Sequence, residues 1–98
     1  FNVRADKNSI RGQHAHSECT QLLVCTNGSI EASCDDGETQ STHILNKPYK
    51  GLLILPEVWV EQKYLENSSI LTVLCDQPFN EEEYIRNYDE FKNYLNSK

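Results

Sequence analysis

The chain has 98 residues, a formal net charge of −6 at pH 7, and nine lysines and arginines that are scattered along it. This length suits one domain with a modest core, which we place at residues 1–98. The scattered positive charge argues against nucleic-acid binding, and no apolar run approaches the roughly 20 residues that a membrane helix needs.

The first ten residues, 1–10, form a short N-terminal segment ahead of the first motif. The segment starts at Phe1, the chain contains no methionine, and no basic-then-apolar signal segment is present. We expect this segment to be a truncated front of the domain. Arg4 lies within it and would support a phosphate group if the segment folded over a binding site.

The most informative run of the chain is Arg11-Gly12-Gln13-His14-Ala15-His16. Side chains repeat with a period of two along a strand, so His14 and His16 should project from the same face. The spacing resembles the first cupin motif, which is H-x-H, three or four residues, an acid, six residues and a glycine. Here Gln21 stands in place of the acid, and Gly28 is the glycine.

Six short stretches rich in β-branched and aliphatic residues alternate with turn signals, which is typical of an all-β sandwich or barrel. We expect the histidine pair to open the first of these strands, and the Asn27-Gly28 turn favours a tight hairpin between the first two. The predicted strands are Gln21–Thr26, Ser29–Cys34, Gln40–Leu45, Gly51–Leu55, Trp59–Tyr64 and Ser69–Cys75.

The last segment, residues 80–97, has a different periodicity. Asn80 and Glu83 are spaced as an N-cap and a capping box. We predict one amphipathic helix, from about Glu81 to Asn96, that packs against the barrel and has a solvated acidic first turn. The residues that recur at helical spacing are Tyr84, Tyr88, Phe91 and Leu95.

Two histidines on one strand support either metal binding or proton transfer. A cupin metal site adds an acid and a third histidine from a second motif. Here Gln21 is a poor ligand, and Val60 stands next to Trp59, where that histidine would be expected. The remaining histidine, His43, lies on a different predicted strand. We therefore expect no metal and no other cofactor.

Proton transfer suits the pair because histidine has an unperturbed pKa of about 6.5 and exchanges protons near neutral pH. Two imidazoles that face one cavity can take a proton from one sugar carbon and return it to the next, which moves a carbonyl through an enediol. Arg11 would hold a phosphate or stabilise the oxyanion, and Gln21 would hydrogen-bond an imidazole or a sugar hydroxyl. The alternative is a pair of structural histidines with satisfied hydrogen bonds.

The run Arg11–His16, the stretch Gln21–Cys25 with Gly28-Ser29, and the tail Glu82–Phe91 resemble the sugar 3,4-ketoisomerases, the WxcM-like cupins. The resemblance implies a small cupin jelly-roll-type barrel with one C-terminal helix. It implies an enzyme that moves the keto group of a TDP-4-keto-6-deoxyhexose from C4 to C3 without metal, in bacterial polysaccharide synthesis. It also implies that Arg11 helps to form the site and that the protein is a homodimer that exchanges N-terminal strands.

The same resemblance implies that His14 and His16 are the acid–base residues, and we expect His16 to be the base at sugar C3 with His14 assisting. The chain departs from the family at Ser17, where lysine is usual, and at Thr20, where glutamate is frequent. Relatives carry one or two further strands before the histidine motif, and those strands hold an active-site tyrosine. The first tyrosine here is Tyr49, so the chain has either lost its front or is a shortened member.

Trp59 and Tyr49 are candidate substrate contacts. Trp59 offers a flat apolar surface on which a nucleotide base can stack, or it is a structural aromatic of the barrel. Tyr49 lies in a turn and either reaches the ligand or packs within its loop. Three other functions stay open: a sugar-binding cupin module without catalysis, a nucleotide-sugar epimerase or dehydratase on the same barrel, and a metal-dependent cupin enzyme.

The cysteines bear on the cellular compartment. They contain no C-x-x-C pair, so their spacing argues against a cysteine-based zinc site. Without a signal segment, we expect free thiols rather than two disulfides, and a cytoplasmic location follows. The four residues are Cys19, Cys25, Cys34 and Cys75.

Overall fold

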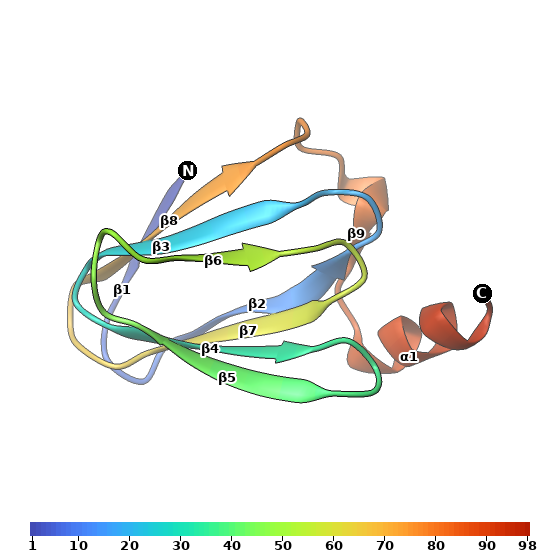
Figure 1. The fold of residues 1–98 in the computed structure, drawn as a ribbon, viewed down its shortest axis with the longest axis horizontal. Helices are drawn as coiled ribbons and strands as arrows, with labels where there is room; N and C mark the ends of the chain where they lie inside the picture. The colour runs from blue at the N-terminus through green and yellow to red at the C-terminus, as the bar shows by residue number, and fades with distance from the viewer.

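The computed structural model describes all 98 residues, Phe1–Lys98. Four strands form one antiparallel sheet in the order β1-β8-β3-β6, and five form a second in the order β5-β4-β7-β2-β9. The two sheets face each other, and the single helix α1 lies beside the second (Figure 1), which confirms the predicted all-β class with one C-terminal helix. The elements are β1 (Asn2–Ala5), β2 (Ile10–His16), β3 (Gln21–Asn27), β4 (Ile30–Asp35), β5 (Gln40–Leu45), β6 (Gly51–Ile54), β7 (Trp59–Tyr64), β8 (Ser69–Cys75), the 3₁₀ turn η1 (Glu81–Glu83), β9 (Tyr84–Ile85) and α1 (Tyr88–Asn96).

An apolar core fills the space between the sheets. Alternate residues of each strand point into it, as the period of two requires, and Leu23 on β3 and Leu71 on β8 are examples. Tyr64 on β7 is fully buried, and its hydroxyl donates to the carbonyl of Val3 at 2.9 Å. This bond links the second sheet to the edge strand of the first.

All six predicted strands form, with ends that differ by at most one residue, but two predictions about their connections are wrong. The histidine pair closes its own strand, β2, and does not open β3. No hairpin joins β3 and β4 either, because β3 pairs with β6 and β8 while β4 pairs with β5 and β7. Gly28, at φ +80°, turns the chain from one sheet into the other, and the amide of Asn27 donates to the carbonyl of Ser68 at 2.9 Å. That bond holds the turn against the start of β8. The turn therefore connects a strand of the first sheet to a strand of the second and does not form a hairpin.

The predicted helix over residues 80–97 is also wrong in its first third. Asn80 does act as an N-cap, accepting from the amide of Glu82, but the turn it caps is η1 and ends at Glu83. The chain then extends as β9, which pairs with the end of β2. A second N-cap, Asn87, accepts from the amide of Glu90 and starts α1. Backbone groups of β9 are hydrogen-bonded to β2, so this stretch is a strand although its apolar residues recur at helical spacing.

The helix α1 packs against one end of the second sheet and extends past its strands (Figure 1). Phe91 is fully buried and packs with Trp59 of β7 and with Ala15 of β2 in a small cluster separate from the main core. Neither this helix nor η1 has the length and apolar character that crossing a membrane requires. The role of α1 in the fold is therefore to seal the back of the strands that carry the histidine motif.

Candidate functional site

A bulge in β2 places the two histidines. Gly12 has φ +84° and Gln13 has φ +53°, and the pairing with β7 shifts register between Gly12 and His14. At this φ any other residue would be strained, and a Cβ on Gly12 would also lie 2.6 Å from Oε1 of Gln62. Beyond the bulge the strand alternates regularly, and the His14 and His16 rings lie on one face with their centroids 4.9 Å apart.

Each imidazole has one nitrogen held and one nitrogen free. Nδ1 of His14 bonds to the carbonyl of Gly12 at 2.9 Å, and Nδ1 of His16 bonds to the carboxylate of Glu83. A carbonyl and an ionised carboxylate only accept hydrogen bonds, so both Nδ1 atoms must carry the proton. The two Nε2 atoms are buried and have no hydrogen-bond partner. With its proton on Nδ1, each ring keeps an unshared lone pair on Nε2.

Glu83 is a site residue that the sequence prediction missed, since the acidic run 81–83 was interpreted as a solvated helix start. Its carboxylate is buried, and besides His16 it accepts from the backbone amides of Glu18 and Cys19, both at 3.2 Å. Burial works to raise the pKa of Glu83, but these three hydrogen bonds outweigh it and hold the pKa below its usual range. The carboxylate is therefore ionised at neutral pH and can stabilise an imidazolium at His16.

His14 differs from His16 in its electrostatic surroundings. Burial lowers the pKa of His14, and the neighbouring imidazole of His16 acts in the same direction. The bond to the carbonyl of Gly12 opposes this shift without reversing it. His14 is thus neutral at physiological pH, with Nε2 as a proton acceptor.

A cavity of about 280 Å³ opens between the sheets in front of His14. Arg11, Gln21, Tyr84 and Arg86 line it together with His14. The Tyr84 ring lies 5.3 Å from the ring of His14 and 4.3 Å from that of His16, between centroids. The guanidinium of Arg86 stacks over Tyr84 at 4.3 Å and pairs with an exposed acid of η1. The cavity therefore combines two arginines, an aromatic face and one imidazole. His16 lines a second cavity of about 220 Å³ instead, so the two imidazoles face different cavities and not one as predicted. Tyr84 lines both cavities.

Of the residues predicted to bind substrate, Arg11 and Gln21 lie at this cavity, and three others do not. Arg4 points away from it and donates to the Ser68 hydroxyl at 3.1 Å. The Trp59 indole lies under α1 on the outer side of the sheet. Tyr49 is 75% exposed in the turn between β5 and β6, which Figure 1 shows at the end of the molecule away from β9.

The cavity also contains two residues that were not predicted as site residues, Tyr84 and Arg86. Tyr84 was predicted to lie on the apolar stripe of the C-terminal helix. Both belong to the stretch that was predicted as the start of the C-terminal helix. Their spacing of two is that of a strand, and β9 pairs Tyr84 with His16. The signal that could have identified them is the resemblance of the tail Glu82–Phe91 to the ketoisomerases, which is stronger than its helical periodicity.

The residues of a cupin metal site do not come together here. The amide nitrogen of Gln21 donates to Sγ of Cys75 at 3.4 Å, so this side chain is directed toward β8. Val60 is buried in the core at the position expected for a second-motif histidine, and His43 bonds to the Ser41 hydroxyl at 3.0 Å. The cupin donor set therefore does not fit this chain.

Comparison with known proteins identifies the family of the chain. The sequence model of the family described as FdtA, WxcM-like, C-terminal, matches residues 1–96. The chain belongs to this family. A curated member of similar sequence is the TDP-4-oxo-6-deoxy-α-D-glucose-3,4-oxoisomerase of Aneurinibacillus thermoaerophilus, which is 40% identical over 85 residues. That alignment covers 87% of this chain, and the chain spans 61% of the length of this relative.

Solved structures of 3,4-ketoisomerases have the same fold. A 3,4-ketoisomerase from Helicobacter canadensis matches with a TM-score of 0.93 at 38% identity, covering 98% of this chain and 73% of that one. QdtA, a sugar 3,4-ketoisomerase from Thermoanaerobacterium thermosaccharolyticum in complex with TDP, matches with a TM-score of 0.92 at 33% identity, covering 99% and 72%. The predicted family and barrel fold are thereby confirmed.

Proposed function

We propose that this chain forms the acid–base core of a nucleotide-sugar 3,4-ketoisomerase. The observation that carries the proposal is the pair of imidazoles, His14 and His16, with their Nδ1 atoms held by acceptors and their buried Nε2 atoms unpartnered. The names of the relatives support the substrate class, a TDP-4-keto-6-deoxyhexose, and the reaction, which moves the keto group from C4 to C3. Such a step supplies deoxysugars for bacterial surface polysaccharides.

In the proposed mechanism Nε2 of His16 removes the proton from sugar C3. The C–H electron pair forms the C3–C4 double bond, and the C4 carbonyl oxygen takes up negative charge. His14 takes the hydroxyl proton at C3 and passes it to the C4 oxygen, so that no proton is gained or lost. The imidazolium of His16 exchanges its proton with solvent and protonates C4 as the carbonyl forms at C3. The ionised Glu83 stabilises the imidazolium of His16. No electron leaves or enters the sugar, so no redox cofactor is required.

The side chains around the cavity suit the rest of such a substrate. Arg11 and Arg86 offer guanidinium groups for a diphosphate or for the enediolate oxygen. Gln21 can hydrogen-bond a sugar hydroxyl, and the Tyr84 ring provides a flat face beside the two imidazoles. We assign no metal to the reaction, because the positions of the cupin ligands hold Gln21 and Val60.

Proton NMR of the chain with TDP-4-keto-6-deoxyglucose in deuterated buffer tests this proposal. We expect a 3-keto product with deuterium at C4, formed at the same rate with and without a chelator. Deuterium at C3 of a retained or inverted 4-keto sugar would contradict isomerisation and indicate an epimerase. Binding shifts with neither product nor exchange would leave a sugar-binding module.

We further propose a homodimer that forms through the outer face of the first sheet. Leu22 on β3 faces Leu53 on β6 and Leu74 on β8, so the three side chains form a row across the sheet. Leu53 and Leu74 are 58% and 56% exposed, so the row presents apolar surface to solvent. A second copy related by a two-fold axis can bury this surface against its own row.

Analytical ultracentrifugation tests the dimer. We expect twice the 11.3 kDa chain mass for the wild-type chain and the monomer mass for the Leu53→Glu, Leu74→Glu double variant. A matched control is Ile44→Glu, at a 50% exposed position on β5 of the other sheet, which should stay dimeric. A wild-type monomer would contradict the proposal.

The cytoplasm is the compartment that we propose for the chain. All four cysteines are free thiols, two of them buried, as a reducing environment allows.

A further inference from the structure

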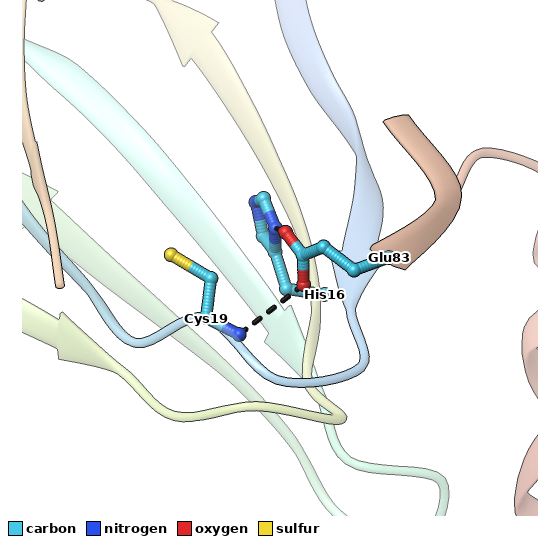
Figure 2. Close-up of side chains that lie close together, drawn as sticks. All are labelled: His16, Cys19 and Glu83. Carbon is cyan, nitrogen blue, oxygen red and sulfur yellow. Dashed lines mark hydrogen bonds and ion pairs between the residues drawn. The ribbon is translucent and has the colours of Figure 1, made fainter. Parts of the chain in front are cut away.

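Three potential metal ligands of different types lie together, and one of them is His16, the proposed base. One ring nitrogen of His16, Sγ of Cys19 and one carboxylate oxygen of Glu83 all lie within 4.8 Å of one another. The three residues are 3%, 4% and 8% exposed, and Figure 2 shows their side chains grouped at the end of β2. They come from β2, from the connection to β3 and from η1, so the fold rather than a local motif assembles them.

These donors are a set that a thiophilic divalent cation uses. Zn²⁺ binds imidazole nitrogen, thiolate sulfur and carboxylate oxygen at about 2.0–2.3 Å in tetrahedral geometry, whereas Mg²⁺ and Ca²⁺ prefer oxygen alone. Ligand atoms of such a site lie about 3.3–3.8 Å apart. The three ligand atoms lie within 4.8 Å of one another, which exceeds these separations by at most about 1.5 Å. A cation that enters would replace the hydrogen bond between His16 and Glu83.

The site has a route to solvent and a fourth donor. A cavity of about 220 Å³ is lined by all three residues and also by Cys75, Phe79 and Tyr84. Cys75 is exposed, and its Sγ accepts a hydrogen bond from Gln21 at 3.4 Å. A cation entering from this side would meet the Cys75 thiol first. The second observation that points to a ligand is the unpartnered Nε2 of the buried His16.

We propose that His16, Cys19 and Glu83, with Cys75 as the fourth ligand, form an inhibitory site for a thiophilic divalent cation of the Zn²⁺ type. This site shares only His16 with the cupin metal site, since it uses neither His14, nor Gln21, nor the Val60 position. Binding of the cation does not depend on the proposed reaction. The inhibitory effect of the cation does rest on that reaction.

Inhibition follows from the tautomers of His16. In the metal-free protein the proton on Nδ1 faces Glu83, and Nε2 keeps its lone pair. A cation that binds Nδ1 forces the proton of the neutral ring onto Nε2, and a cation that binds Nε2 occupies the lone pair directly. Either way the nitrogen that the proposed isomerisation needs can no longer accept a proton.

Cation binding must also release the thiol proton of Cys19. Burial, reinforced by the nearby Cys75, raises the pKa of this thiol to about 11. A thiol that coordinates a divalent cation is deprotonated by the charge of the ion, so the proton leaves as the cation binds.

The experiment uses the purified full chain, stripped with a chelator, and titrates it with Co²⁺ and Zn²⁺ in the absence of sugar. We expect one Co²⁺ per chain with a sulfur-to-cobalt charge-transfer band, and displacement of Co²⁺ by Zn²⁺. Cys19→Ser should lose the strongest part of the band. It should also weaken Zn²⁺ binding by at least about tenfold, because the loss of a direct ligand lowers metal affinity at least as much as the loss of a residue that only supports a ligand. Cys75→Ser, at an exposed position, should weaken both to a smaller extent.

Cys34→Ser on β4 is the matched control and should bind as the wild type does. The site is refuted if no thiolate band appears, or if the band persists unchanged in the Cys19→Ser and Cys75→Ser variants. Zn²⁺ should also block deuterium uptake by the sugar in the wild-type chain. Zn²⁺ binding in a chain that catalyses no exchange would overturn the proposed function and leave the metal site standing, so the two failures are distinguishable.

Discussion

Replacing His16 with asparagine should lower kcat for the 3,4-isomerisation by about 10²–10⁴-fold, the range that a positioned general base contributes. Asparagine fills a similar space and its amide can still face Glu83, but it has no nitrogen that accepts a proton from carbon. The ring of His16 is buried and its Nε2 has no protein partner, so no neighbouring group can take over the same position. The measurement is the rate of 3-keto product formation by NMR at saturating substrate.

Two variants control this result. His43→Asn removes the third histidine, which lies on β5 and bonds to Ser41, and should leave kcat within about twofold of wild type. His14→Asn should reduce kcat less than His16→Asn, because we assign it the assisting proton transfer. A His16→Asn variant that turns over at a near-normal rate would remove His16 from the role of base.

The strands of this protein could be predicted because the alternation that marks them is local. Buried and exposed residues alternate along β3 and β8 as their sequences suggest, and turn residues bound each strand. Partners are not local: Asn27-Gly28 is a hairpin signal in sequence, yet β4 finds its neighbours in β5 and β7. Which strand pairs with which depends on how both sheets bury their faces together.

The site could be predicted only where its residues sit on one strand. The period of two fixes His14 and His16 on a common face, and Arg11 lies before the bulge on the same strand. The partner of His16 is Glu83, 67 positions further along the chain, and no spacing rule connects them. Trp59 shows the reverse case: it is adjacent to Val60, which is in the core, so its side chain must face the opposite side of the sheet, under α1.

Replacing Glu83 with glutamine should lower kcat by about 10²–10⁴-fold without touching the substrate, because it changes the tautomer of His16. The carboxylate accepts three hydrogen bonds, from Nδ1 of His16 and from the amides of Glu18 and Cys19. Glutamine has only one accepting oxygen. If that oxygen faces the two amides, its NH₂ group faces His16, so Nδ1 must become the acceptor and the proton moves to Nε2. Product formation by NMR measures the loss of the base.

The matched control is Glu82→Gln, one position earlier, where the side chain is exposed and makes no hydrogen bond to the histidines. It should keep wild-type kcat, while Glu83→Gln loses it with little change in KM. If Glu83→Gln instead keeps kcat within a few-fold of wild type, Glu83 is a structural residue and does not set the tautomer of His16.

The stability of the same variant gives a second readout, with a sign fixed by the pKa of Glu83. That pKa is lowered in the folded chain from an ordinary value of 4.5, so the unfolded chain binds the proton more tightly. The carboxylate therefore contributes stability that is fully present above pH 4.5 and is lost as pH falls through the folded value.

Urea unfolding across pH 7 to 3 measures this contribution. The free energy of unfolding should fall with pH in the wild type and in Glu82→Gln, and should depend less on pH in Glu83→Gln. At pH 7 the glutamine should cost about 1–3 kcal/mol, since a buried donor or acceptor is left unpaired. A variant with wild-type pH dependence would show that Glu83 is not the ionised buried acceptor on which the mechanism depends.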